Sequence, residues 1–139
     1  MWAELCLYLV LNWGAVEQQT CEQIVADAQE LGAEKHVYEL LAIGWHESRF
    51  TASAISGVYV GALQVNPKWA VDCQDCTEIQ QAISVFLAWK HKDRCTHISR
   101  FMNGWAGVCD ERTQARIILA DKLKRLSIRL KRRKIKVNK

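Results

Sequence analysis

An apolar stripe that ends beside a single carboxylate constrains this chain more than any other feature. Small and apolar residues follow the i, i+3, i+4, i+7, i+8 spacing of one helical face at Val37, Leu40, Leu41, Gly44 and Trp45. This spacing predicts a helix over residues 33–48, with Glu47 at the edge of the stripe. Desolvation beside Trp45 and Phe50 would disfavour the charged form of the Glu47 carboxyl group. We therefore expect Glu47 to lie at the rim of a cleft and to act as an acid near neutral pH.

The segment that begins at Glu47 carries an extended motif. It reads Glu-Ser-Arg-Phe at 47–50, Ala-Ile-Ser-Gly at 54–57 and Gly-Ala-Leu-Gln-Val-Asn-Pro at 61–67. This run resembles the core motif of the soluble lytic transglycosylase domain, a lysozyme-like family with Glu-Ser-x-Phe, Ala-x-Ser, and Gly-Leu-Met-Gln-Ile before a Pro. The matching positions are Glu47, Ser48, Phe50, Ala54, Ser56, Gly57, Gly61, Leu63, Gln64 and Pro67. The spacing from Glu47 to Gln64 is slightly shorter than the commonest family pattern, which we interpret as a turn variant.

A second resemblance lies downstream, where residues 101–107 read Phe-Met-Asn-Gly-Trp-Ala-Gly. Asn103 and Gly104 match the Tyr-Asn-Gly signature that closes the cleft opposite the acid in this family. Met102 stands where the family usually has Tyr, so no Tyr hydroxyl at that position orients Glu47. Together the two motifs extend the resemblance from Cys21 to about Leu126. The mixture of basic and apolar residues from Thr113 to Leu126 is similar to that of the closing helix in short phage-type members.

The resemblance implies both a fold and an activity. The fold is expected to be mainly α, a lysozyme-like helical domain with a small turn or β-hairpin segment that lines the glycan cleft. In the family, one Glu protonates the glycosidic oxygen between N-acetylmuramic acid and N-acetylglucosamine, and the sugar's own 6-hydroxyl then attacks. The product is a 1,6-anhydro end. The resemblance thus predicts a peptidoglycan lytic transglycosylase with Glu47 as its general acid and base, and it implies no cofactor and no catalytic metal.

Two other functions remain open. A hydrolase similar to goose-type lysozymes generally needs a second carboxylate across the bond, and no acidic residue lies between Glu47 and Asp72. This gap favours transglycosylation over hydrolysis. A lysozyme-like module without activity, which binds glycan or a polyanion, is the second alternative, and Met102 is the residue that favours it.

Further residues are predicted to contact the sugar around Glu47. Ser48, Ser56, Gln64 and Asn103 are expected to bind the substrate by the resemblance. Aromatic rings can stack on sugar faces at Tyr59, Trp69 and Trp105, with core packing as the other interpretation of each. We expect Trp45 to pack in the core. His46 points about 100° away from Glu47 on a helix, so we interpret it as structural or exposed.

Several other segments have recognisable local structure. A helix is predicted over Thr20–Leu31, with Thr20 as its N-cap and Gly32 as its stop. Small and β-branched residues between 51 and 67 predict turns and a short hairpin. Helical spacing returns at 77–89, and further helices are expected over 95–102 and from about residue 111 through Leu130.

The charge of the chain is divided unevenly. Ten of its nineteen Lys and Arg residues and none of its fifteen acidic residues lie in 122–139, whereas the first 121 residues carry a net charge of −6. A basic segment on an acidic body suggests a polyanionic partner, such as nucleic acid, anionic lipid or an anionic cell-wall polymer. A solubilising and partly disordered end is the other interpretation.

The length of 139 residues suits one compact domain. We expect a lysozyme-like domain over 1–126, with an N-terminal helix or arm at 1–19, and a basic C-terminal tail at 127–139 outside the fold. The apolar start lacks the basic residues of a secretory signal, so localisation stays unknown beyond action on the cell wall, in the periplasm or as a phage virion or lysis protein. The protein is expected to be a monomer.

Six cysteines leave three states open. Cys73 and Cys76 form one close pair, and Cys95 and Cys109 follow with His91 and His97 nearby, which could supply the ligands of a zinc site. The later spacings fit no strong zinc pattern. Disulfides are favoured outside the cytoplasm, and free buried thiols are the remaining alternative.

Overall fold

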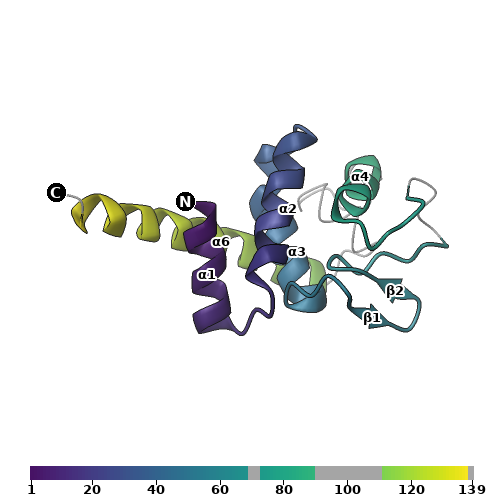
Figure 1. The fold of residues 1–139 in the computed structure, drawn as a ribbon. Helices are drawn as coiled ribbons and strands as arrows, with labels where there is room; N and C mark the ends of the chain where they lie inside the picture. The colour runs from purple at the N-terminus through teal and green to yellow at the C-terminus, as the bar shows by residue number, and fades with distance from the viewer. Residues whose placement is uncertain (69–72, 90–110, 138–139) are drawn as a thin grey trace.

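The computed structural model describes residues 1–68, 73–89 and 111–137, and these residues are mainly helical with one small sheet. The mainly α fold class is therefore confirmed (Figure 1). In chain order the elements are α1 (Trp2–Trp13), α2 (Gln18–Glu30), the 3-10 turn η1 (Glu34–His36), α3 (Val37–Ser48), β1 (Ile55–Ser56), β2 (Tyr59–Val60), α4 (Ile79–Trp89) and α6 (Glu111–Val137). None of the described helices combines the length and apolarity that crossing a membrane requires.

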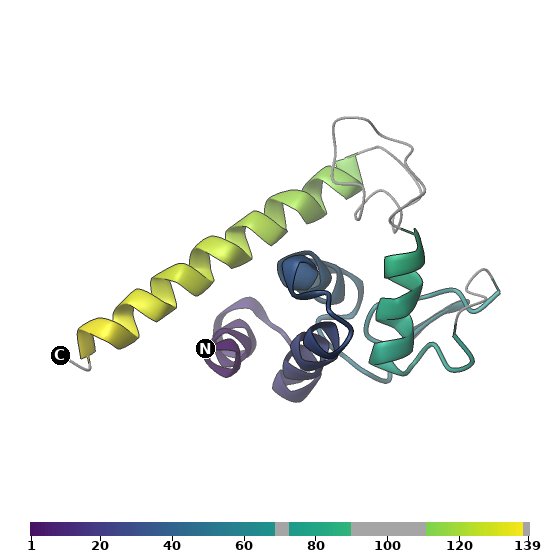
Figure 2. The same ribbon diagram turned by 90° about the horizontal axis from the view of Figure 1, so that it is seen from above.

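Helix α3 lies at the centre of the fold, where it packs against α2 and α6. The predicted apolar stripe is buried, but so are Ala42 and Ile43 on the other side, because neighbours cover α3 from more than one direction (Figure 2). The chain reverses sharply after the helix, with Arg49 and Phe50 both at positive φ. This reversal places the buried Phe50 ring against Gly44, where a Cβ would lie 3.0 Å from the ring. Gly44 is therefore needed for the close packing beneath the end of α3.

The N-terminal stretch is a helix, α1, that packs against α2 and is joined to it by a disulfide between Cys6 and Cys21. Both cysteines are fully buried. At the start of α1, the Trp2 ring lies 5.2 Å from that of Tyr38 on α3. Residues 1–13 are thus part of the core rather than a separate arm.

Removing the Cys6–Cys21 disulfide is expected to lower the free energy of unfolding substantially. The bond closes a loop with a sequence separation of 15, and a cross-link of that span is worth about 3 kcal/mol. The Cys6→Ser and Cys21→Ser double variant should therefore unfold at a lower urea concentration than the oxidised protein. The Cys73→Ser and Cys76→Ser double variant, which keeps the Cys6–Cys21 bond, is the matched control. An unchanged urea midpoint of the Cys6→Ser and Cys21→Ser variant would contradict the prediction.

Helix α2 begins two residues before the predicted N-cap, so the assignment of Thr20 as the N-cap is wrong. Glu17 occupies the cap position, and the buried Thr20 hydroxyl donates to its carboxylate at 2.7 Å. Glu17 also binds a distant backbone amide, which explains why the helix starts there rather than at Thr20. The predicted stop is confirmed, because Gly32 follows the helix at φ 71°.

The segment after α3 contains the predicted short hairpin, in which Ile55 pairs with Val60 and Ser56 with Tyr59. A further bridge joins Val60 to Val65. Gly61 has φ 81°, and a Cβ on it would lie 2.8 Å from the Cys76 carbonyl oxygen. The hairpin and the loop around Cys76 therefore pack so closely that only glycine fits.

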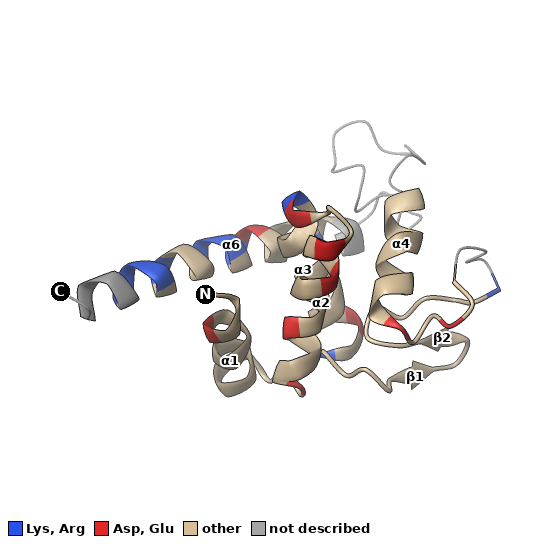
Figure 3. Ribbon diagram, turned by 45° about the horizontal axis from the view of Figure 1, so that its top comes forward, with Lys and Arg blue, Asp and Glu red and all other residues tan. Residues whose placement is uncertain are grey.

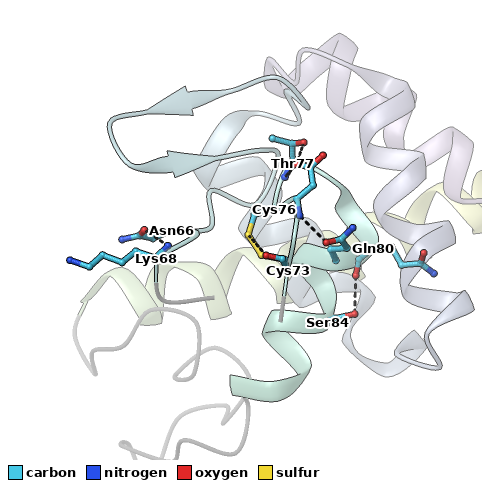
Figure 4. The surroundings of a disulfide bond; sticks show 9 residues. Asn66, Lys68, Cys73, Cys76, Thr77, Gln80 and Ser84 are labelled. Carbon is cyan, nitrogen blue, oxygen red and sulfur yellow. Dashed lines mark hydrogen bonds between the residues drawn. A yellow bond between two sulfur atoms is a disulfide. The ribbon is translucent and has the colours of Figure 1, made fainter. Parts of the chain in front are cut away.

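That loop is closed by a disulfide between Cys73 and Cys76 and leads into α4 (Figure 4). The four cysteines in the described residues form two disulfides, so for them the disulfide is the one of the three open states that the structure shows. Over the same part of the chain, no group of three His, Cys, Asp or Glu side chains is arranged to hold a metal ion. The other proposed zinc ligands, His91, Cys95, His97 and Cys109, lie outside the described residues, as does the helix predicted over 95–102.

Helix α6 is longer than predicted, because the basic run continues it as far as Val137 instead of ending it. Ser127 is 2% exposed and Leu130 packs against the core. The expected boundary at residue 126 therefore falls inside a packed helix, and the expectation of a tail outside the fold is wrong at its first turn. Beyond that turn the helix projects past the other elements (Figures 1 and 2).

Candidate functional site

Glu47 lies in the last turn of α3, and its side chain is 23% exposed. The neighbours in sequence have the predicted apolar character, since Phe50 is fully buried and Trp45 is partly buried. The carboxylate does not stand alone, however. It accepts a hydrogen bond from the guanidinium of Arg116, which reaches it from α6 and is 16% exposed. A partly buried ion pair is therefore the central contact of the site.

The pairing of Arg116 with Glu47 was not predicted, although the sequence carries a signal for it. Arg116 precedes Leu119, Ala120 and Leu123 by three, four and seven residues, and all three are buried. An arginine on the buried stripe of a helix needs an anionic partner, because an unpaired charge is costly to desolvate. The Glu47 carboxylate is that partner.

Ser48 connects the end of α3 to the hairpin region. Its hydroxyl lies 2.7 Å from the Ala62 carbonyl oxygen and 3.3 Å from that of Gly44, and its oxygen accepts the Thr51 amide at 3.0 Å. All of these hydrogen bonds join the Ser48 hydroxyl to groups of the protein itself. Ser48 therefore fixes Glu47 relative to the segment around Ala62, and the predicted contact of Ser48 with substrate stays a prediction.

The Gln64 side chain also forms hydrogen bonds with groups of the protein itself. Its side chain is buried, with the residue 6% exposed, and its amide nitrogen donates to the carbonyl oxygens of Gly61 at 2.8 Å and Ala54 at 3.1 Å. These bonds hold the hairpin closed and support Gln64 itself at φ 53°. Direct binding of sugar by Gln64, as the resemblance implies, would therefore involve its carbonyl oxygen.

Two predicted substrate residues face solvent on the hairpin. Ser56 and Tyr59 form one register pair of the β1–β2 sheet, and both are exposed, Tyr59 to 49%. An exposed ring next to a Gly-rich turn is available to stack on a sugar face. The remaining predicted contacts, Trp69, Asn103 and Trp105, lie outside the described residues, as does Met102.

The N-terminal segment contacts the end of α3 that carries Glu47. The Trp45 indole donates to the Trp13 carbonyl oxygen at 3.3 Å, and the two rings meet edge to face with centroids 6.0 Å apart. The Val16 amide donates to the Arg49 carbonyl oxygen at 2.7 Å. The Arg49 guanidinium lies 3.4 Å above the Trp45 ring, a cation–π contact. Residues 13–17 thus hold the sharp turn that ends α3.

His46 is exposed, as the sequence suggested, and it also borders α6. Partial burial of the ring, followed by the nearby positive charges of Arg116 and Arg49, lowers the pKa of His46 below its ordinary value of 6.5. Its ring lies 5.3 Å from that of Trp45. At neutral pH His46 is therefore uncharged and adds no positive charge beside Glu47.

Glu17 is a structural carboxylate that the sequence did not single out. The Ala52 amide, which donates to it at 2.8 Å, and then the Thr20 hydroxyl lower the pKa of Glu17 below 4.5. A carboxyl group with a lowered folded-state pKa contributes stability above its unfolded pKa and loses it as pH falls through the folded pKa.

We therefore expect Glu17→Gln to be less stable than wild type at pH 6, with a difference that shrinks below pH 4.5. Urea midpoints measured at both ends of this range test the prediction. Glu22→Gln, on the same helix, controls for the loss of one carboxylate. A difference that grows on acidification would contradict the linkage.

Comparisons with models of protein families, with curated proteins and with solved structures found no match to this chain. Its function therefore has to be inferred from the residues themselves.

Proposed function

We propose that this protein is a peptidoglycan lytic transglycosylase with a lysozyme-like fold, and that Glu47 is its general acid and base. The observation that carries the proposal is the position of Glu47. It is a partly covered carboxylate in the last turn of a buried helix, and Ser48 ties it to the hairpin of the motif through the Ala62 carbonyl oxygen. The motif residues that resemble the family are thus connected in space as well as in sequence.

The proposed reaction needs only one carboxylate. Protonated Glu47 gives its proton to the glycosidic oxygen as the bond to the anomeric carbon of N-acetylmuramic acid breaks. The resulting carboxylate accepts the proton of the 6-hydroxyl, whose oxygen bonds to the anomeric carbon and closes the 1,6-anhydro ring. Atoms balance without water. Because Arg116 donates a hydrogen bond to Glu47, which must carry a proton to act as the acid, we expect this contact to change when a glycan occupies the site.

Hydrolysis by a muramidase is the nearest alternative. It would need a second carboxylate to activate water. Asp75 is an exposed carboxylate in the Cys73–Cys76 loop, and it accepts hydrogen bonds from the Thr77 amide and hydroxyl. Mass analysis of muropeptides released from purified peptidoglycan separates the two reactions. Anhydro ends support transglycosylation, whereas reducing ends would show hydrolysis.

A binding module without activity is the second alternative, and the Arg116–Glu47 ion pair is the observation that favours it. A carboxylate that is already paired with a partly buried guanidinium can be a purely structural group. The same experiment decides, because a binding module would release no muropeptide of either kind.

The ion pair also makes a prediction about stability. Arg116→Gln should lower the free energy of unfolding by about 1–3 kcal/mol, since a hydrogen bond between charged groups is lost. Glu47→Gln should cost less in the Arg116→Gln background than in wild type, with a coupling of roughly 0.5–3 kcal/mol in a double-mutant cycle. Urea denaturation of the four proteins provides the measurement, and strictly additive effects would show that the pair is not formed in solution.

A further inference from the structure

A hollow of the surface lies between the end of α1 and the second half of α6. It has a volume of about 570 Å³ and is lined by Trp13, Lys122, Arg125, Ile128, Arg129 and Arg132. We call it the basic groove. Four of its six lining residues are cationic, and the positions of Lys and Arg, blue on the ribbon, recur along α6 in Figure 3.

The positive charge of the groove is poorly compensated. Asp121 pairs with Arg125 one turn along the helix, and no acidic residue follows Asp121 in the sequence. Among the ion pairs of the described residues, none involves Lys122, Arg129 or Arg132. Three cations that have no counter-ion within the described part of the chain therefore border one concave surface, which favours an anionic ligand.

The spacing of these cations suits an extended ligand. Lys122, Arg125, Arg129 and Arg132 follow one another at i, i+3, i+7 and i+10, which places them along one face of α6. The row is about 15 Å long at 1.5 Å per residue. A linear polyanion can lie along such a row and contact successive cations.

A lipid surface fits the groove less well. The apolar face of α6 is occupied by the core, with Leu123 and Leu126 buried, so the helix cannot lay that face into a membrane. The cations border a hollow, whereas lipid headgroups present a flat surface. Nucleic acid also fits less well, because binding of single strands relies on rings that stack on bases, and the Trp13 ring is already packed against Trp45.

We propose that the basic groove binds a linear phosphodiester polymer of the cell wall. The choice of a wall polymer rests on the proposed function, whereas the anionic chemistry rests on the groove alone. A polymer held on α6 would keep the protein close to the wall and so raise the effective concentration of glycan around Glu47.

The test uses the full chain and purified poly(glycerol phosphate), labelled at one end and followed by fluorescence anisotropy. The groove variant carries Arg129→Gln and Arg132→Gln. The control variant carries Lys124→Gln and Lys131→Gln, which removes the same charge from exposed positions of the same helix that do not line the groove. We expect the groove variant to bind about tenfold or more weakly and with a shallower salt dependence, because two phosphate contacts are lost. The control variant should bind within about threefold of wild type.

Each other outcome overturns the proposal. Equal losses in the two variants, at equal melting temperatures, would mean that diffuse charge and not the groove binds the polymer. Tighter, groove-dependent binding of single-stranded DNA with the same number of phosphates would assign the groove to nucleic acid. Tighter binding to phosphatidylglycerol vesicles would assign it to lipid. These readouts do not involve turnover, so loss of the transglycosylase assignment and loss of the groove assignment are distinguishable.

Discussion

Glu47→Gln is expected to abolish release of muropeptides from peptidoglycan while the protein stays folded. The amide keeps the shape of the side chain but can neither give nor take the proton, and loss of an essential general acid costs about 10²-fold or more in rate. Its oxygen can still accept a hydrogen bond from Arg116, so the contact between α3 and α6 is retained in part. Release of labelled fragments from purified peptidoglycan, measured at equal protein concentration, is the readout.

Glu39→Gln is a matched control, because the same helix carries both residues. The Glu39 side chain is 22% exposed, compared with 23% for Glu47, and it too has an ionisable partner, His36 at 3.0 Å. The control should keep its activity, since the proposal gives Glu39 no role in proton transfer. Retention of more than about a tenth of the wild-type rate by Glu47→Gln would contradict the assignment, given the size of the expected effect.

The helices were predictable because their apolar periodicity is strong. The stripe of α3 and the spacing in α2 and α4 placed these elements to within a few residues, and Gly-rich, β-branched sequence placed the hairpin. Rules based on neighbouring residues failed where a contact with a residue far away in the sequence determined the local structure. Thr20 has the chemistry of an N-cap, yet Glu17 takes that position because it also binds the Ala52 amide, which lies 35 residues away.

The candidate site was predictable only in its central residue. Its most important contact joins residues 69 positions apart, and only the packing of α3 on α6 brings Arg116 to Glu47. The hydrogen-bond partners of polar side chains could not be predicted from the sequence either. Residue type allows Ser48 and Gln64 to bind a sugar or to bind backbone, and the fold directs their donors to the Ala62 and Gly61 carbonyl oxygens. The pairing of Cys6 with Cys21 likewise depends on how α1 packs against α2.

The basic end of the chain shows how charge can conceal packing. A run of cations without acids is typical of a solvated tail, but apolar residues recur beneath it. Leu123 and Leu126 are buried and Leu130 packs against the core, and together they form the inner face of α6. One face of α6 therefore packs against the core, and its other faces carry the charged side chains.

Deletion of residues 127–139 is accordingly expected to destabilise the whole fold. It removes Leu130 and the buried Ser127, and it leaves Leu126 as the last residue of a helix end that frays. Partial loss of two or three buried leucine contacts costs about 3–6 kcal/mol, since removal of a single core leucine side chain costs about 2–5 kcal/mol. That is a large share of the roughly 5–15 kcal/mol that holds a small domain folded.

Thermal and urea unfolding of the truncated chain test this prediction, and a charge control separates packing from electrostatics. Lys131→Gln with Arg133→Gln removes two exposed charges of the deleted segment but keeps its residues, so it should unfold at nearly the wild-type midpoint. Activity of the truncated chain on short soluble glycans should fall together with its folded fraction, because α6 also carries the Arg116 that contacts Glu47. Wild-type stability after the deletion would instead mean that α6 contributes to the core only up to Leu126.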